Sequence, residues 1–284
     1  MKGTIMQEFA PVNWPDGKRV AVMLTFDFDA DTLWLSRDPE NALRPGTLSQ
    51  GQYGAKVGVP KILETLKTAG VPATFFVPGW TVETYPDRTD AIMKEGHEIG
   101  HHGYLHEWID PREPEREEEA FVRGLEALRA RGIEPRGFRS PAWETSPNMI
   151  SLLAKYGFHY DSSFMDTVHP YLHATTGNPV VEIPVHWSLD DAPFMMFSTR
   201  TPRTIMTNSH LLEIWQAEFE EIREWGGVFN LTMHPQFTGR PSRIRLLRDM
   251  IEWLQQFPDV WFARGHEVCD AWLSSNDSAR AASE

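Results

Sequence analysis

The sequence Arg19-Val-Ala-Val-Met-Leu-Thr-Phe-Asp-Phe-Asp29 decides the fold of this chain. Residues 19–26 form a largely apolar run, which is typical of a strand buried on both faces in a parallel sheet. Asp27 and Asp29 follow at the end of that run. Because side chains alternate along an extended backbone, the two carboxylates point the same way and can serve one site.

Short β-rich runs alternate with helical segments along the rest of the chain. Further strands are predicted at residues 73–77, 98–101, 137–139, 159–162, 180–185, 228–233 and 260–263. Helices are predicted at residues 60–69, 114–131, 147–156, 210–225 and 243–257. This alternation predicts βαβ units, a parallel sheet and a closed or nearly closed (β/α) barrel. A doubly wound open sheet is the alternative, but no Gly-x-Gly-x-x-Gly loop follows the first strand.

Residues 30–55 form a long stretch with little periodicity that is rich in proline and glycine. A loop of this length in a compact domain is usually functional or disordered. Because the stretch directly follows the acidic cluster, we expect it to be a loop that forms the lid or wall of an active site.

The charge balance is acidic, because 27 Lys and Arg oppose 40 Asp and Glu for a formal net charge of −13. This balance argues against a nucleic-acid partner and against docking on anionic membranes, both of which favour basic surfaces. Cys269 is the only cysteine, so no intramolecular disulfide is possible. Residues 1–11 lack the apolar segment of a secretory signal, and no apolar run reaches the length of a membrane helix. We therefore expect a cytoplasmic protein.

Polar residues gather at the predicted ends of strands in four separate segments. These residues are Asp27, Asp29, Asp31, His101, His102, His106, Arg139 and His234. In a parallel barrel all these strand ends lie on one face, which is the face that carries active sites. Carboxylates, imidazoles and a guanidinium are therefore expected to converge there.

Carboxylates and imidazoles together suit a divalent cation. His102 and His106 have the i,i+4 spacing of two histidines on one face of a helical turn. His97 and His101 share that spacing, so spacing alone does not choose the pair. Asp29 with two histidines supplies three ligands and leaves a position open for water, which is the pattern of a catalytic site.

Two further residues suit acid–base chemistry beside such a cation. Asp27 is free to act as general base on the water, and His234 could protonate a leaving nitrogen. Each polar residue alone has an ordinary structural explanation: a solvated aspartate loop, a surface ion pair for Arg139, a turn histidine before Pro235. Their joint placement favours a hydrolytic site.

Four segments carry a family resemblance: Thr25-Phe-Asp-Phe-Asp29, Gly96-His-Glu-Ile-Gly-His-His-Gly-Tyr-Leu-His106, Arg139-Ser-Pro141 and Leu231-Thr-Met-His234. In this order they resemble the motifs of the polysaccharide deacetylase family, carbohydrate esterase family four. Further similar segments are 57–63, 73–79, 188–197 and 234–241. They resemble the branch that holds the Helicobacter-type peptidoglycan deacetylase, the cyclic imide hydrolases and the metal-free allantoinases.

The resemblance implies an α/β fold, a distorted (β/α) barrel with about seven parallel strands. It implies one domain over residues 1–284, with a core from about residue 10 to about residue 275. It places the metal triad on Asp29, His102 and His106, with zinc as the expected ion and cobalt or nickel as alternatives. All three ligands are present, so a metal-dependent enzyme is expected.

The resemblance also assigns roles around the triad. Asp27 is the implied general base, oriented by Arg139, and His234 is the implied general acid. A carboxylate is expected behind that histidine, and by position we place it at Asp190, with Asp191 as the alternative. A backbone N–H near Ala142 could hold the oxyanion of the reaction.

The predicted reaction is metal-dependent hydrolysis of a non-peptide C–N amide bond. An N-acetylated sugar or glycan is one substrate class, and ring opening of a small cyclic imide or ureide is the alternative. A non-catalytic sugar- or metal-binding barrel is a third possibility. Four tryptophans beside the motifs could stack on a sugar or flat ring, or belong to the core: Trp34, Trp80, Trp143 and Trp187. The resemblance also implies a homo-oligomer, such as a tetramer.

Overall fold

Strand β1 (Val20–Asp27) is buried along its whole length and organises the sheet. On one edge it pairs in parallel with β8 (Val228–Met233), from Ala21 opposite Val228 to Phe26 opposite Met233. Its other edge is shared, because β9 (Val260–Phe262) pairs with its first residues and β2 (Thr74–Val77) with its last. The segment that opens the strand pattern is therefore the centre of the fold.

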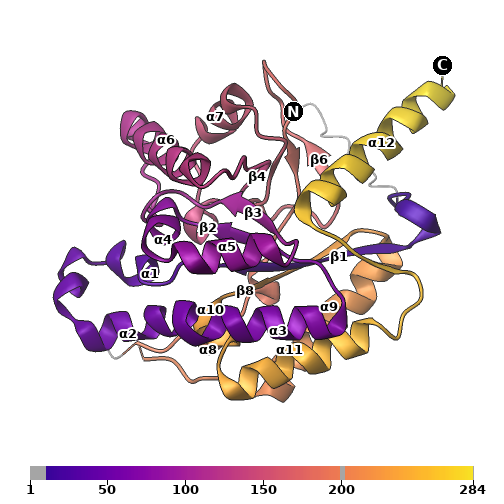
Figure 1. Ribbon diagram of the computed structural model, residues 1–284. Helices are drawn as coiled ribbons and strands as arrows, with labels where there is room; N and C mark the ends of the chain where they lie inside the picture. Colours follow the sequence, from indigo (N-terminus) through magenta and orange to yellow (C-terminus); the bar gives the residue numbers. More distant parts are fainter. Residues whose placement is uncertain (1–10, 199–201, 284) are drawn as a thin grey trace.

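The computed structural model describes residues 11–198 and 202–283 of the chain (Figure 1). The remaining strands are β3 (Glu98–His101), β4 (Gly137–Phe138), β5 (Tyr160–Asp161), β6 (Tyr171–Leu172) and β7 (Val181–Glu182). Within the described residues the sheet has nine strands in the order β6-β7-β5-β4-β3-β2-β1-β8, with β9 beside β1. Among the strands of the described residues, only β6 runs antiparallel, against β7.

The predicted α/β class and the parallel sheet are confirmed, and the sheet forms a curled half-barrel. No ladder among the described residues joins β8 to β6, so the barrel is open on that side. An isolated parallel bridge between Asp190 and Thr232 instead brings residue 190 against β8. This bridge places the segment after β7 beside the carboxyl end of β8.

Helices surround the sheet (Figure 1). They are α1 (Thr32–Leu35), α2 (Pro45–Tyr53), α3 (Val59–Ala69), α4 (Gly79–Thr84), α5 (Pro86–Lys94), α6 (Pro114–Ala130), α7 (Met149–Tyr156), α8 (Ala192–Met195), α9 (Asn208–Trp225), α10 (Pro235–Thr238), α11 (Pro241–Leu254) and α12 (Gly265–Ser283). Short 3-10 turns cover Pro15–Gly17, Pro39–Leu43, Pro141–Trp143 and Trp187–Leu189. No helix in the described part of the chain combines the length and apolar character needed to cross a membrane.

Side chains of β1 point alternately to the two faces of the sheet, so they belong to two different core clusters. Val22 and Leu24 belong to the large cluster that packs against helices such as α3, α9 and α11. Ala21 and Met23 belong to a separate cluster with Tyr160 and Val181 from the opposite strands. Because side chains alternate along a strand, Asp27 falls on the same face as Ala21 and Met23, toward the inside of the half-barrel.

The prediction of a loop at residues 30–55 is wrong, because this segment is largely helical. It contains α1, the turn Pro39–Leu43 and α2, and it continues into a π-helical turn at Gly54–Gly58. A Cβ at Gly51 would lie 2.3 Å from the carbonyl oxygen of Ala30, and one at Gly58 would lie 2.2 Å from that of Pro235. These helices pack by close backbone approach at glycines, so the segment lacks the apolar stripe that identifies a helix in sequence.

Candidate active site

The predicted polar residues lie together at the carboxyl ends of the strands. Asp27 ends β1, and Asp29 follows it by two residues. His102 and Arg139 each follow directly on a strand, β3 and β4, and His234 follows β8. The side chains of all these residues are buried, as is that of His106. Residues from four separate segments therefore form one site, as the strand-end argument predicts.

One carboxylate oxygen and two imidazole nitrogens form the centre of the site. Asp29 Oδ1 lies 3.4 Å from His102 Nε2 and 3.9 Å from His106 Nε2. Within the described residues, Asp29 Oδ1 and His102 Nε2 are buried and have no hydrogen-bond partner. Buried polar atoms without partners are rare and call for a ligand. One ligand atom from each of the three residues lies within 4.8 Å of the others, so together they could hold a metal ion.

His102 is oriented by its other ring nitrogen. Nδ1–H donates to the backbone carbonyl oxygen of Arg139 over 2.7 Å, which leaves Nε2 as the nitrogen with a free lone pair. This tautomer is the one that histidine metal ligands generally adopt. The donor set of one carboxylate oxygen and two imidazole nitrogens fits zinc and similar divalent ions.

His106 reaches the site from a loop. The predicted helical turn across His102 and His106 is not formed, because β3 ends at His101 and no helix begins before Pro114. His106 itself has a left-handed backbone, with φ of 59°. The turn of the chain, rather than helical periodicity, brings the two rings to a centroid distance of 5.2 Å. Positive φ in a non-glycine residue is uncommon and is often found at functional sites.

The three residues at the centre differ in protonation: burial lowers the pKa of His102, but the charges of Asp27 and Asp29 outweigh it and raise that pKa above its ordinary value. Burial alone raises the pKa of Asp29, but the nearby imidazoles of His106, His102 and His234 outweigh it and lower the pKa to about 2. Burial lowers the pKa of His106 to about 4, which keeps its ring neutral. An ionised carboxylate and a neutral imidazole are the forms that bind metal.

His101 faces away from this centre. Its ring packs on Phe121, and its Nε2 lies 2.9 Å from the Phe121 carbonyl oxygen. Its Nδ1 accepts a hydrogen bond from the backbone N–H of Gly103. His97 carries two buried ring nitrogens without partners and packs against Phe75. The structure thus brings His102 and His106 to Asp29 and leaves His97 and His101 outside the site, with His101 buried and His97 half-buried.

Arg139 holds Asp27 in place. Its Nη1 donates to Asp27 Oδ1 over 2.8 Å and to Thr25 Oγ1 over 2.9 Å. The guanidinium is fully buried and lies 4.2 Å from the centroid of the Phe76 ring. Asp27 Oδ2, on the other side of the carboxylate, lies 3.9 Å from His102 Nε2. The salt bridge therefore fixes one oxygen of Asp27 and leaves the other facing the centre of the site.

The remaining donors of Arg139 bind residues that the sequence reasoning did not single out. Nε donates to the Ser162 carbonyl oxygen, and Nη2 donates to Ser162 Oγ and Asn230 Oδ1. Ser162 is held in turn by Asp161, whose Oδ1 accepts from its backbone N–H. Ser162 directly follows β5, whereas Asn230 lies within β8, so no shared sequence pattern indicates the two residues.

A second buried cluster supports Ser162 from behind. It consists of Asp161, His173 and Glu182, with His173 Nε2 2.9 Å from Glu182 Oε2. Burial and the charge of Glu182 raise the pKa of Asp161 well above its ordinary value, and burial raises that of Glu182 to about 8. A proton shared within this cluster accounts for two carboxyl groups at one buried place.

His234 is supported by Asp191. Its Nδ1–H donates to Asp191 Oδ1 over 2.7 Å, and its backbone N–H donates to Asp191 Oδ2 over 3.0 Å. Thr238 Oγ1 also donates to Asp191 Oδ2. The sequence predicts this carboxylate at Asp190, with Asp191 as the alternative, but Asp190 Oδ1 lies 3.6 Å from His234 Nδ1 and accepts from the Ala192 N–H. At the turn into α8, Asp190 binds the backbone N–H of Ala192. The hydrogen bond to the His234 ring is therefore made by Asp191.

The charge of His234 is set by these two acids. Burial alone lowers its pKa, but the charges of Asp190 and Asp191 outweigh it and raise the pKa well above the ordinary value. Burial raises the pKa of Asp190 itself to about 7, against the effect of His234. His234 Nε2 points to the centre, 3.7 Å from Asp29 Oδ2. His234 Nε2 therefore lies beside the carboxylate of Asp29, one of the candidate metal ligands.

The turn after β4 carries strained backbone beside the site. Ala142 and Trp143 have φ of 54° and 55° in the Pro141–Trp143 turn. Non-glycine residues in this region cost about 1–3 kcal/mol each and cluster at functional sites. Ala142 lines a cavity of about 540 Å³ together with Trp187. The buried Trp143 ring supports the Trp187 ring at a centroid distance of 4.2 Å.

The four predicted tryptophans occupy different environments. Trp187 is exposed and lines the 540 Å³ cavity, while Trp143 is buried beneath it. Trp34 is buried but borders a second cavity of about 390 Å³. Trp80 is half-buried and packs on Tyr85 without lining either cavity. Trp108, which the sequence reasoning did not consider, also lines the 540 Å³ cavity and is 59% exposed.

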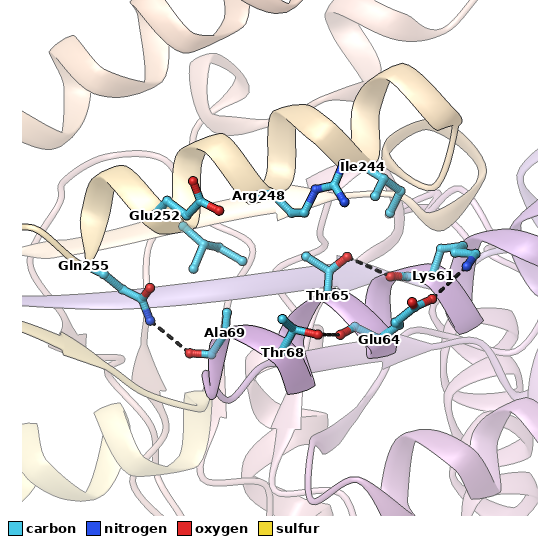
Figure 2. A pocket seen from close by; sticks show the side chains of 10 residues that line it. Lys61, Glu64, Thr65, Thr68, Ala69, Ile244, Arg248, Glu252 and Gln255 are labelled. Carbon is cyan, nitrogen blue, oxygen red and sulfur yellow. Dashed lines mark hydrogen bonds and ion pairs between the residues drawn. The ribbon is translucent and has the colours of Figure 1, made fainter.

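Another cavity lies away from this chemistry. It has a volume of about 290 Å³ and lies between α3 and α11, with Thr65, Ala69 and Ile244 among its lining residues (Figure 2). Figure 2 shows that its polar side chains bond mainly within α3, as in the pair Lys61 and Glu64. It contains none of the site residues described above.

Comparisons with known proteins show which family this chain resembles in sequence and fold. The family model for polysaccharide deacetylases matches residues 16–160. The peptidoglycan deacetylase of Helicobacter pylori is 30% identical over 290 residues, which cover 91% of this chain and 98% of that protein. A crystal structure from Mycobacterium smegmatis, classed among the polysaccharide deacetylases, superposes with a TM-score of 0.91 at 42% identity, covering 94% of this chain and 95% of that one. An allantoinase shares the fold at 22% identity, with a TM-score of 0.82 and coverage of 95% of each chain.

Proposed function

Because this chain belongs to the polysaccharide deacetylase family, we propose that it hydrolyses the N-acetyl amide of an N-acetylated glycan and releases acetate and a free amine. The observation that carries the proposal is the convergence of two unpartnered buried ligand atoms, on Asp29 and His102, with an anchored carboxylate and a protonated histidine. This set contains every group that hydrolysis of an amide needs.

Members of this family are metal-dependent hydrolases, and Asp29, His102 and His106 would hold the ion. When bound, the ion supplies Lewis-acid polarisation of the amide carbonyl and makes a water molecule more acidic. Zinc is the ion we propose, with cobalt or nickel as alternatives, because the donors are one oxygen and two nitrogens.

Asp27 is the proposed general base. Arg139 binds its Oδ1, so the proton is accepted at Oδ2, on the side of the metal-binding residues. The buried guanidinium donates to five acceptor atoms, and this rigidity holds the carboxylate in one orientation. Attack of the water on the acetyl carbon then forms a tetrahedral intermediate whose oxyanion faces the turn at Ala142. We assign the backbone N–H of Ala142 as a donor to that oxygen.

His234 is the proposed general acid. The neighbouring acids keep its ring protonated, and Asp191 fixes the tautomer and orientation so that Nε2–H points into the site. Donation of this proton to the leaving nitrogen breaks the C–N bond and releases the amine. Asp27 and His234 thus take a proton from water and return one to nitrogen.

Assembly is a further part of the proposal. We expect a homo-oligomer, as the family resemblance implies, and sedimentation equilibrium of the purified chain tests it. A single monomeric species at micromolar concentration would contradict this part without affecting the catalytic proposal.

The substrate class is tested with a panel of amides. The zinc-loaded chain is incubated with chitooligosaccharides, muropeptides, succinimide, hydantoin and allantoin, and acetate, free amine and ring-opened acid are measured. Release of acetate with a new free amine from a glycan is the expected result. The variant Asp27→Asn serves as the control that lacks the base. Exclusive turnover of the small rings would reject the glycan substrate, and binding without turnover of any amide would favour a non-catalytic barrel.

A further inference from the structure

Two arginines without an acidic partner line the 540 Å³ cavity beside the candidate site. Arg37 follows α1, and Arg203 precedes α9; both border the 540 Å³ cavity that Ala142 and Trp187 also line. In the part of the chain that the structure describes, neither guanidinium makes an ion pair or a hydrogen bond. Glu144 lines the same cavity but pairs with neither of them.

Unpaired arginines are notable in a chain with this charge balance. Forty acidic residues are available to 27 basic ones. Many other arginines of the described chain use them, as in the pairs Arg19–Glu224, Arg129–Glu134, Arg131–Asp90, Arg136–Asp270 and Arg223–Asp259. Arg37 and Arg203 are exposed and, unlike other arginines without a carboxylate, share the wall of one cavity, so both can reach an anion that enters it.

The two guanidinium groups are close enough to affect each other and the metal-binding carboxylate. Desolvation and the like charge of Arg203 lower the pKa of Arg37, while the charge of Asp29 acts in the opposite direction. Arg37 therefore lies within electrostatic range of both groups. Two like charges held near one another are unfavourable until an anion lies between them.

The shape and lining of the cavity fit a sugar-sized ligand. A volume of about 540 Å³ lies within the usual range for small-molecule sites. The exposed rings of Trp108 and Trp187 offer flat apolar faces, and guanidinium groups form paired hydrogen bonds with planar anions such as carboxylates.

We propose that Arg37 and Arg203 bind a carboxylate on the substrate, so that the enzyme prefers amides that carry a carboxylate over their neutral counterparts. The inference rests on the proposed function for the reaction, but it concerns only what else the substrate carries. The carboxylate can belong to an acidic N-acetylated sugar or to a small cyclic amide with an acid side arm. Both sources share the chemistry that the arginines recognise.

Two matched substrate pairs test the inference. The first pair is an N-acetylated disaccharide with a lactyl ether carboxylate and the same disaccharide with that acid converted to a methyl amide. The second pair is hydantoin-5-acetate and unsubstituted hydantoin. The readout is the ratio of kcat/KM for the acidic member to that for the neutral member, measured with the zinc-loaded chain.

The variants Arg37→Gln and Arg203→Gln remove one charge each, and Arg37→Lys keeps the charge without the planar fork. The control is Arg248→Gln, which removes an exposed arginine from the separate cavity between α3 and α11 (Figure 2). It changes the net charge equally, so it separates local binding from a general electrostatic effect.

We expect the wild-type ratio to exceed about tenfold for at least one pair, as charged hydrogen bonds allow. Either glutamine variant should reduce that ratio toward one through KM for the acidic substrate, Arg37→Lys should reduce it in part, and Arg248→Gln should not change it. An equal rate on acidic and neutral members, or an unchanged ratio in both glutamine variants, would overturn the inference. Failure of the proposed glycan function looks different: neither disaccharide is hydrolysed, whatever the result with the hydantoins.

Discussion

His234 Nδ1 and Asp191 Oδ1 lie 2.7 Å apart, and the same carboxylate accepts the backbone N–H of His234 through its other oxygen. One side chain thus fixes both the ring and the backbone of the proposed acid. Asp190, the neighbouring residue, has its Oδ1 3.6 Å from the same nitrogen and influences the ring mainly by charge. The two adjacent aspartates can therefore be told apart by mutation.

Asp191→Asn should lower kcat by about 10²-fold or more, because it removes the charged acceptor that holds the imidazolium and its tautomer. Asp190→Asn should lower kcat by less than about tenfold, because it removes charge without this hydrogen bond. Steady-state kinetics on the best glycan of the panel measure both. A larger loss of kcat in Asp191→Asn than in Asp190→Asn, with KM little changed, identifies Asp191 as the positioning residue. A larger loss in Asp190→Asn would reverse the assignment.

Asp29→Ala should abolish both metal binding and hydrolysis. Asp29 supplies the only oxygen of the proposed ligand set, and its loss leaves two imidazoles. Metal content per chain, measured by elemental analysis after loading with zinc, should fall from about one to near zero. His210→Ala is the control, since His210 is exposed on α9. Full activity of wild-type protein after chelation, with no metal detected, would overturn the metal role.

Arg139→Lys should lower kcat by about 10²-fold, because a lysine cannot replace the donors that hold Asp27 and reach Ser162 and Asn230. Ser162→Ala removes one acceptor of the same guanidinium and should have a smaller effect. If Arg139 only stabilises the fold, both variants should lose thermal stability without a change in kcat at low temperature. Thermal unfolding measured beside the kinetics separates these outcomes.

Glu182→Gln should flatten the dependence of stability on pH. The pKa of Glu182 is about 8 in the folded chain against an ordinary value of 4.5. The folded state therefore retains a proton that the unfolded chain releases, so its stabilising contribution is complete below the ordinary value and declines as pH rises toward about 8. Asp161, which faces Glu182, also has a raised pKa and contributes in the same direction.

Denaturant unfolding between about pH 5 and pH 9 measures this slope. The control is Glu252→Gln, an exposed glutamate on α11. The wild type and the control should both lose stability with rising pH more steeply than Glu182→Gln. Equal slopes in all three would mean that the buried cluster does not hold the extra proton.

Gly51→Ala should destabilise the chain by about 1–3 kcal/mol and reduce activity, because close packing leaves no room for a methyl group. Its Cβ would lie 2.3 Å from the Ala30 carbonyl oxygen, next to Asp29. Gly46→Ala, in the same helix α2, is the matched control because nothing lies within 4 Å of its Cβ. Equal stability of the two variants, by thermal or denaturant unfolding, would contradict this account of the segment.

The sequence alone indicates the centre of the fold and the residue types of the site. The apolar run of β1 and the period-two spacing of Asp27 and Asp29 are local patterns. In an extended strand they place both carboxylates on the same side. The carboxyl ends of the parallel strands β3, β4 and β8 lie at the same edge of the sheet. The convergence of the histidines and Arg139 could therefore be predicted. The roles assigned to these residues remain predictions that the experiments above test.

Tertiary structure decided what depends on contacts between distant segments. Asp191 rather than Asp190 meets His234 because the turn into α8 and the bridge to Thr232 set the direction of each side chain. His106 reaches Asp29 through a left-handed loop residue, which no helical spacing describes.

The helices in segment 30–55 pack through close backbone contacts at glycines. Such contacts leave no apolar pattern in the sequence, so the sequence does not reveal these helices. Arg37 and Arg203 are far apart in sequence, and only the tertiary structure places them on the wall of the same cavity. Sequence periodicity reports which face of a local element is buried, whereas pairing between distant side chains depends on how those elements pack.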